Sequence, residues 1–211
     1  MYTREFWDAI YRKHFYDAPW MSNSCVNGHI ANIEKYILDF KGKEFLDYGC
    51  GNGELAFHFY NKGAHVDLAD ISDELVNWLK KKYAKYGIGI YNVEKPAELQ
   101  EEGKTYDIIV ATSLFHHIEP DLWEEFLVGF NEILRPGGLL VIGGWDKTDE
   151  VIAEDNNKAR FTGQQTWPIN DMSAIIQRIN EYNLIVNTIE DLPVEAFPNP
   201  RKIRYFIIKK Q

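Results

Sequence analysis

The stretch Phe45-Leu-Asp-Tyr-Gly-Cys-Gly-Asn-Gly53 decides the fold. It begins as an apolar strand, expected over 44–48, and ends in three glycines at alternate positions, directly before a helix expected over 54–61. Glycines between a parallel strand and a helix let the backbone approach a ligand closely. The stretch therefore predicts a ligand-binding turn at the carboxyl edge of a parallel sheet.

Short apolar runs alternate with amphipathic segments on both sides of this turn. Strands are expected at 44–48, 65–70, 88–91, 107–112 and 139–142, and helices at 4–16, 29–40, 54–61, 72–86, 120–134 and 170–182. Strands that are apolar throughout are typical of a parallel sheet covered by helices on both faces. The last two runs, 184–189 and 203–208, have no helix between them. The pattern predicts a doubly wound α/β fold that ends in an antiparallel pair.

The composition favours one globular domain that binds neither nucleic acid nor membranes. The chain has 211 residues, of which 45% are hydrophobic, and a formal net charge of −9. This charge repels phosphate backbones and anionic lipids. No apolar run is long enough to span a membrane, and the first residues lack the pattern of a signal peptide. Two cysteines are too few for a disulfide framework. We expect a cytoplasmic monomer or homodimer without a metal site.

The single domain, 1–211, is expected to have four parts. Residues 1–28 form an N-terminal cap segment, and 29–145 form the cofactor-binding core. Residues 146–167 are a polar connection of the kind that often serves as a lid. Residues 168–211 supply a C-terminal helix and the edge hairpin.

Two acids beside the expected turn indicate which ligand it binds. Asp47 adjoins the glycines, and Asp70 ends the next strand. A carboxylate about 4 Å from a pyrophosphate would cost on the order of 4 kcal/mol, and Glu54 stands where the dinucleotide fingerprint has its third glycine. The same carboxylate attracts S-adenosylmethionine, which carries a sulfonium and an α-ammonium and no phosphate. Asp70 could accept both ribose hydroxyls, with Ile71 against the adenine.

The order of motifs resembles that of the class I S-adenosylmethionine-dependent methyltransferases. The motifs that carry the resemblance are Leu46-Asp-Tyr-Gly-Cys-Gly-Asn-Gly53, Asp70 in Ala-Asp-Ile-Ser, Tyr106-Asp-Ile-Ile-Val-Ala-Thr-Ser113 with Phe115-His-His-Ile118, and Leu134-Arg-Pro-Gly-Gly-Leu139. The resemblance implies a seven-stranded, mostly parallel Rossmann-like sheet with a terminal antiparallel hairpin. It also implies that Asp47, Gly49 and Gly51 hold the methionine part of the cofactor, that Asp70 holds the ribose, and that Ile71 flanks the adenine.

Further cofactor contacts are expected at the ends of other strands. The family usually has an acid after the third strand, which bonds the adenine amino group, and this chain has Asn92 there. Asn92 could accept that bond through its amide oxygen, and the Val93 N–H could meet the ring, with Glu94 as a rival. Cys50 supplies the small side chain wanted inside the turn. Thr112 ends the fourth strand, where a backbone carbonyl could receive the α-ammonium.

Histidines after the fourth strand are the candidates for acceptor chemistry. His117 has the ordinary pKa range of a general base, but it could instead shape its loop through a backbone hydrogen bond. His116 is expected to be a wall of the substrate pocket. Three further side chains are expected to contribute to that pocket: Trp145, Arg160 and Trp167.

Two N-terminal aromatic side chains, Tyr11 and Trp20, are expected to cover the cofactor, with plain helix packing as the alternative. We interpret the chain as a methyltransferase that moves a methyl group from S-adenosylmethionine to an oxygen or nitrogen nucleophile of a small molecule. Three alternatives stay open at this point. They are a non-catalytic protein or partner subunit that binds S-adenosylmethionine or S-adenosylhomocysteine, a dinucleotide oxidoreductase, and an aminopropyl transferase of the same fold.

Overall fold

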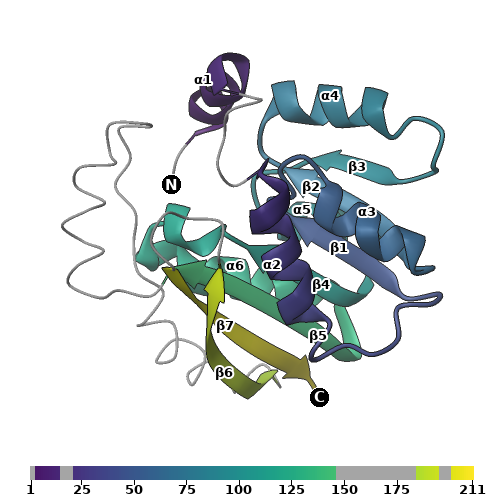
Figure 1. Cartoon of the computed structure of the whole chain (residues 1–211), viewed down its shortest axis with the longest axis vertical. Helices are drawn as coiled ribbons and strands as arrows, with labels where there is room; N and C mark the ends of the chain where they lie inside the picture. The colour runs from purple at the N-terminus through teal and green to yellow at the C-terminus, as the bar shows by residue number, and fades with distance from the viewer. Residues whose placement is uncertain (1–2, 15–20, 146–183, 195–200) are drawn as a thin grey trace.

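The structure, a computed structural model, describes residues 3–14, 21–145, 184–194 and 201–211 (Figure 1). The helices are α1 (Arg4–His14), α2 (Asn23–Ile33), α3 (Glu54–Asn61), α4 (Asp73–Lys82), α5 (Ala97–Glu101) and α6 (Trp123–Ile133). The strands are β1 (Glu44–Tyr48), β2 (His65–Asp70), β3 (Gly89–Asn92), β4 (Tyr106–Thr112), β5 (Leu134–Trp145), β6 (Leu184–Val194) and β7 (Arg201–Lys210). Two short 3₁₀ turns, Phe115–His117 and Pro120–Leu122, connect β4 to α6.

The strands form one seven-stranded sheet in the order β3-β2-β1-β4-β5-β7-β6. Strands β1 to β5 run parallel, whereas β7 is antiparallel to both β5 and β6. The chain proceeds from β1 outward to β3 and then returns to the other side of β1 with β4. This reversal makes β1 and β4 the topological switch point of the sheet, and in open α/β sheets ligands bind beside the carboxyl ends of the strands at such a point. The predicted doubly wound sheet and its terminal antiparallel pair are confirmed.

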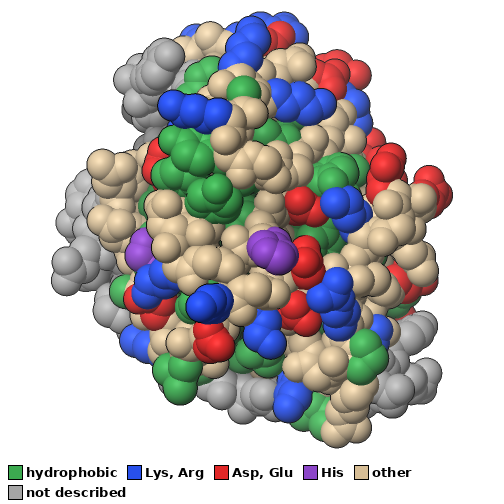
Figure 2. All heavy atoms as spheres, turned by 90° about the vertical axis from the view of Figure 1, so that its right-hand side faces the viewer, with side chains coloured by type: hydrophobic (Ala, Val, Ile, Leu, Met, Phe, Trp, Pro, Cys, Tyr) green, Lys and Arg blue, Asp and Glu red, His purple; other side chains and the backbone are tan. Residues whose placement is uncertain are grey.

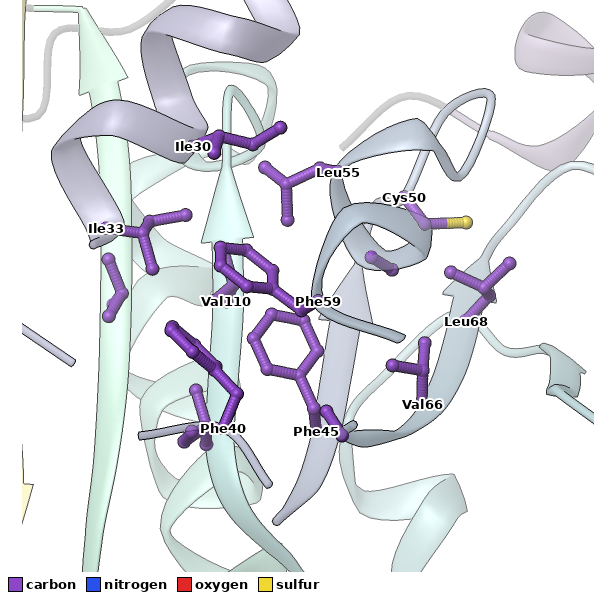
Figure 3. Packing of buried hydrophobic residues seen from close by; sticks show 14 of the residues in the cluster. Ile30, Ile33, Phe40, Phe45, Cys50, Leu55, Phe59, Val66, Leu68 and Val110 are labelled. Carbon is purple, nitrogen blue, oxygen red and sulfur yellow. The ribbon is translucent and has the colours of Figure 1, made fainter. Parts of the chain in front are cut away.

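Alternate side chains of each central strand enter two separate hydrophobic layers. Phe45 of β1 packs under α3, where its ring centroid lies 5.0 Å from that of Phe59. Phe59 also stacks on Phe40 at 4.3 Å, and Figure 3 shows the three rings meeting between the helices and the sheet. The next residue, Leu46, enters the opposite layer with Trp123 of α6. This alternation follows from the two-residue period of a strand, and it explains why the central strands are apolar throughout.

The second helix differs from the predicted range of 29–40. Helix α2 begins after Ser22, whose hydroxyl accepts a hydrogen bond from the Cys25 N–H at 3.4 Å, and it ends at Ile33. Ile37 and Phe40 are still buried, although they lie beyond the helix. The chain continues to pack against the core after the helix has ended. A prediction from apolar periodicity alone therefore places the helix too far toward the C-terminus.

Strand β5 is longer than the predicted range of 139–142, because it begins at Leu134 and includes residues 136–138. The pairing with β4 shifts register between Tyr106 and Ile108, which leaves room for the extra residues opposite them. Helix α4 also ends earlier than predicted, at Lys82, and the helix expected over 120–134 begins as the 3₁₀ turn Pro120–Leu122. The lid loop over 146–167 and the helix over 170–182 lie outside the described residues.

The surface carries both signs of charge. Figure 2 shows lysine and arginine side chains interspersed with aspartate and glutamate over the face that it displays. In the described part of the chain, no helix has the length and apolar character needed to cross a membrane.

The packing of Phe40, Phe45 and Phe59 between α3 and the sheet predicts how much Phe59 contributes to stability. Phe59 is fully buried, so Phe59→Ala should lower the free energy of unfolding by about 3–5 kcal/mol, through lost apolar burial and the cavity left behind. Urea unfolding followed by circular dichroism measures this loss. Leu38→Ala is the matched control, because Leu38 is 93% exposed and its truncation should change stability little. A loss at Phe59 no greater than that at Leu38 would contradict the packing described.

Candidate functional site

The glycine turn after β1 is the frame of the site. The N–H groups of Gly49 and Cys50 both donate to the Ala69 carbonyl of β2, at 2.8 and 3.2 Å. The Gly53 N–H then donates to the Cys50 carbonyl at 3.0 Å, which closes a tight turn in front of α3. Gly49, Gly51 and Gly53 all have positive φ, the left-handed region that glycine enters without steric cost.

The glycines of the turn serve different purposes. A Cβ built on Gly53 would lie 2.8 Å from the Tyr83 ring, so this glycine is needed for packing inside the protein. A Cβ on Gly49 would lie 3.2 Å from Leu114. A Cβ on Gly51 would have no atom within 4 Å, so Gly51 faces open space. Of the three, Gly51 is the position at which a ligand can approach the backbone most closely.

Side chains that sequence reasoning missed hold the turn from behind. The Asn52 carbonyl accepts from the Lys82 ammonium at 2.9 Å and from the Tyr83 hydroxyl at 3.2 Å. The same lysine pairs with Glu54, the residue that replaces the third glycine of the dinucleotide fingerprint. Glu54 thus anchors the turn to α4. In the sequence, the only indication of this anchoring was Glu54 at the position where the dinucleotide fingerprint has glycine.

Asp47 and Asp70 are both buried at the carboxyl ends of neighbouring strands, 3% and 6% exposed. Burial raises the pKa of Asp47 to about 7, and the Asp70 carboxylate adds a smaller upward effect. Burial likewise raises the pKa of Asp70 to about 6, although hydrogen bonds from the backbone of Ser72, Gly51 and Ile71 oppose it. Among the described residues, no lysine or arginine forms an ion pair with either acid, and Oδ2 of Asp47 has no hydrogen-bond partner.

This electrostatic arrangement fits a cationic, hydroxyl-bearing ligand. A buried carboxylate without a paired cation is costly, and it is stabilised by a ligand that brings a positive charge or further hydrogen-bond donors. The Ser72 N–H holds Oδ1 of Asp70 at 3.0 Å and so fixes the orientation of that carboxylate. Half-buried Ile71 lies directly beside it. The structure brings Asp47, Gly51, Asp70 and Ile71 to the same edge of the sheet.

The contacts expected after β3 need one correction. The Val93 N–H donates to the Asp70 carbonyl at 3.1 Å, so this donor is used within the protein and is not available to an adenine ring. The Asn92 amide nitrogen donates to the Ile71 carbonyl at 3.0 Å, which leaves the amide oxygen as the acceptor of that side chain. The Glu94 side chain is exposed, and its N–H donates to Glu98 at 2.8 Å.

Helix α1 is attached over the carboxyl end of β2. Oδ1 of Asp8 accepts from the Ser72 hydroxyl at 2.6 Å and from the Glu74 N–H at 3.1 Å, and Arg12 pairs with Glu74 at 2.7 Å. These bonds join α1 to the first turn of α4, and Figure 1 shows the two helices beside each other. Tyr11 is buried in the hydrophobic layer that contains α3.

The histidines after β4 lie between the sheet and α1. The rings of His116 and His117 are 4.1 Å apart, and His117 meets the ring of Trp7 edge-on at 5.1 Å. His116 is buried, and burial lowers the pKa of His117 to about 4. The His117 imidazole is therefore neutral at neutral pH. Trp7, which sequence reasoning did not select, is an N-terminal aromatic residue in contact with this histidine.

The strand end before these histidines is strained. Thr112 is buried, and Ser113 has a φ of 57°, the one positive value among the non-glycine residues that the structure describes. Such a conformation costs of order 1–3 kcal/mol and persists only where its surroundings enforce it. The remaining candidates, Trp20, Arg160 and Trp167, lie outside the described residues, as does the side chain of Trp145.

The histidine, cysteine and acidic side chains of the described segments were expected to form no metal site, and the two cysteines lie inside the protein. No group of three or more histidine, cysteine, aspartate or glutamate side chains in them could hold a metal ion. Cys25 and Cys50 are buried and free, and burial raises the pKa of the Cys50 thiol well above its ordinary value. Cys50 therefore acts as a small packing residue inside the turn.

Comparison with known proteins agrees with this site. A family model described as a methyltransferase domain matches residues 24–185. A ubiquinone biosynthesis O-methyltransferase of Rickettsia bellii (strain OSU 85-389) is 23% identical over 171 residues, 79% of this chain and 70% of that protein. The enzyme of the same name from Rhizobium etli (strain CIAT 652) is 31% identical over 131 residues, 62% of this chain. That alignment spans about half, 51%, of the Rhizobium protein.

Solved structures share the fold. The magnesium protoporphyrin IX methyltransferase of Synechocystis PCC 6803, crystallised with S-adenosylhomocysteine, superposes with a TM-score of 0.73 at 17% identity, over 99% of this chain and 98% of that one. The 1,6-didemethyltoxoflavin-N1-methyltransferase of Burkholderia thailandensis, also with S-adenosylhomocysteine, gives 0.66 at 15% identity, over 100% and 92%. The family match, the doubly wound sheet and the paired acids at its switch point lead to one conclusion: the chain belongs to the methyltransferase domain family, as a class I, S-adenosylmethionine-dependent enzyme.

Proposed function

We propose that this enzyme methylates an oxygen or nitrogen nucleophile of a small molecule, with the cofactor held along the carboxyl ends of β1 and β2. The observation that carries the proposal is the pair of buried carboxylates, Asp47 and Asp70, beside the open face of Gly51. When bound, S-adenosylmethionine supplies a methyl group already activated by its sulfonium. What remains for the protein is to bind, orient and exclude water.

Residues at the ends of β1 and β2 would bind different parts of the cofactor. Asp47, Gly49 and Gly51 on the β1 side would hold the methionine part, where a carboxylate complements the α-ammonium. Asp70 on β2 would accept the ribose hydroxyls, Ile71 would flank the adenine, and the amide oxygen of Asn92 would accept from the adenine amino group. Tyr11 and Cys50 support this arrangement from the hydrophobic layer behind it.

The acceptor would enter from the β4 side, between the histidine turn and α1. In-line displacement at a methyl carbon requires the nucleophile and the methyl group to be held close together and aligned. Such positioning can lower the activation barrier by roughly 7–11 kcal/mol. Trp7, His116 and His117 form the described wall of this side. Because His117 is neutral, we propose that it accepts the hydrogen bond, and then the proton, of an acceptor hydroxyl or amine.

The acceptor's chemistry is inferred from three kinds of support. The curated relatives described above are named as O-methyltransferases, and the Burkholderia structure is of an enzyme that methylates nitrogen. The chain's net charge of −9 disfavours a nucleic-acid acceptor. Its two reduced, buried cysteines fit a reducing compartment such as the cytoplasm.

Methyl transfer tests the proposal directly. We expect transfer of a tritium-labelled methyl group from S-adenosylmethionine to at least one member of a panel of phenols, catechols, carboxylic acids and nitrogen heterocycles. The measurement is radioactivity in the extracted organic product. Tight binding of S-adenosylhomocysteine with no transfer to any member would favour the alternative of a non-catalytic binding protein or partner subunit.

His117→Gln separates proton acceptance from cofactor binding. A general base contributes about 10²–10⁴-fold, so kcat on the acceptor found above should fall by at least about 100-fold, while the affinity for S-adenosylhomocysteine stays within about twofold. His58→Gln is the matched control, since His58 pairs with Glu34 on the surface of α3. Unchanged turnover in His117→Gln would assign His117 to loop shape alone.

Asp70→Asn tests the ribose contact. The substitution keeps the shape and removes the charge, so S-adenosylhomocysteine should bind at least about tenfold more weakly, because charge-assisted hydrogen bonds contribute roughly 1.5–3 kcal/mol. Isothermal titration calorimetry gives the dissociation constant. Asp67→Asn on the same strand is the control, because Asp67 faces Lys104 and Tyr106 instead. Equal affinity in Asp70→Asn and wild type would remove Asp70 from the site.

Cofactor affinity should depend on pH in a direction set by the two acids. Their pKa values in the free protein, about 7 for Asp47 and about 6 for Asp70, lie above those of ordinary aspartates, so both are protonated in acid. The α-ammonium and ribose hydroxyls of the ligand bind the ionised carboxylates, so affinity should be full above pH 7 and fall as the pH drops through 7 and 6. We expect S-adenosylhomocysteine to bind at least about tenfold more weakly at pH 5.5 than at pH 8.

The same acids affect stability with the opposite sign. Folding raises the pKa values of both acids, so their protonation at lower pH stabilises the folded, ligand-free protein. Weaker binding at low pH would therefore not be caused by these two groups unfolding the protein. Calorimetric titrations across this range, with circular dichroism at each pH to confirm folding, make the measurement. A dissociation constant that is flat from pH 5.5 to pH 8 would contradict the assignment of both carboxylates to the ligand.

A further inference from the structure

A chain of buried polar groups connects three elements behind the acceptor side of the site. His29 of α2 is 4% exposed, and its Nδ1 lies 2.6 Å from the hydroxyl of Tyr205 on β7. Its Nε2 lies 3.2 Å from the hydroxyl of Ser113, the residue that follows β4. These residues are distant in the sequence, and none of them has a role in the cofactor site described above.

The strands are built to let Tyr205 reach His29. Thr112, Gly143 and Tyr205 are aligned across β4, β5 and β7. A Cβ on Gly143 would lie 3.0 Å from the Tyr205 ring and 3.2 Å from Thr112, so glycine at this position leaves the space that the ring occupies. The Gly143 carbonyl also accepts from the Ser113 N–H at 2.7 Å.

Ser113 is therefore held at two points in its left-handed conformation. Its N–H is bound to β5 and its hydroxyl to His29, which together maintain a backbone angle that a serine seldom adopts. The chain turns at Ser113 into the segment that places Leu114 against Gly49 and His117 against Trp7. The direction of this turn determines where the His117 ring lies.

We propose that Tyr205, His29 and Ser113 form a positioning chain that fixes segment 113–118, and with it His117, at the acceptor side of the site. The assignment of that side rests on the proposed function, but the contacts do not. A neutral imidazole suits the role, because it has one donor and one acceptor and so bridges two hydroxyl groups. Burial lowers the pKa of His29 to about 4, which keeps the imidazole neutral in the physiological range.

Two variants remove single links of the chain. Tyr205→Phe deletes one hydroxyl and keeps the buried ring, and Ser113→Ala deletes the other hydroxyl on a partly buried residue. Tyr48→Phe is the matched control in the same sheet, because no described residue hydrogen-bonds the buried Tyr48 hydroxyl. Ser113→Gly separates the hydroxyl from the strain, since glycine adopts a positive φ freely.

The measurement is the long-range ¹H–¹⁵N spectrum of the histidine rings in the full chain, with His117 assigned from His117→Gln. In Tyr205→Phe and Ser113→Ala we expect the His117 ring signals to shift or broaden. Its titration midpoint should also rise by about one pH unit or more, as the loosened segment admits water. In Tyr48→Phe both should match wild type. Ser113→Gly should move the His117 signals while it unfolds at a higher temperature than Ser113→Ala.

Each result decides the inference separately from the proposed function. His117 signals and midpoint that are the same in wild type, Tyr205→Phe and Ser113→Ala would overturn the positioning chain. If Tyr205→Phe does not fold, Ser113→Ala and Ser113→Gly carry the test. The affinity of S-adenosylhomocysteine should change by less than about twofold in these variants, because the ribose contact lies on β2. If the wild-type protein did not bind S-adenosylhomocysteine, the proposed function would be overturned. The comparison of His117 ring signals between the variants and wild type would still test the positioning chain.

Discussion

Burial of two carboxylates at the carboxyl ends of β1 and β2, without a cation paired to either in the described residues, is the constraint on which the site depends. Burial raises the cost of ionising both acids, and the Asp70 carboxylate adds a smaller cost at Asp47. A negatively charged ligand would make the arrangement worse, whereas a ligand with an ammonium group and ribose hydroxyls relieves it. The preference for S-adenosylmethionine over a dinucleotide thus follows from charge as much as from the shape of the turn.

The remaining structure keeps those groups in place. Lys82 and Tyr83 fix the turn through the Asn52 carbonyl, and Asp8 attaches α1 to the start of α4 beside Asp70. The crossover from β3 to β4 puts the His117 segment on the other side of β1, so different strands supply the proposed cofactor side and the proposed acceptor side. The two sides can therefore be altered separately, which is why ribose binding and proton acceptance are expected to respond to different substitutions.

Sequence reasoning predicted the sheet correctly, and it selected the strand-end acids of the candidate site, because both depend on local patterns. Continuous apolar strands, a glycine turn and an acid at the next strand end are short-range signals. Long-range contacts left no such signal. The helix α2 was placed too late because Ile37 and Phe40 are buried without being helical. The Val93 N–H looked available because its acceptor, the Asp70 carbonyl, lies 23 residues away along the chain. The pairing of Trp7 with His117 and the chain from Tyr205 to Ser113 likewise join distant segments.

A crystal structure of the full chain with S-adenosylhomocysteine is the most direct test of the central claim. We expect the ribose hydroxyls to lie within hydrogen-bond distance, about 2.5–3.0 Å, of the Asp70 carboxylate. We also expect the methionyl amino group to lie on the Asp47 side of the turn, with the ligand against the open face of Gly51. A ligand bound elsewhere in the protein, or one that contacts neither carboxylate, would contradict the assignment of Asp47 and Asp70 to the cofactor.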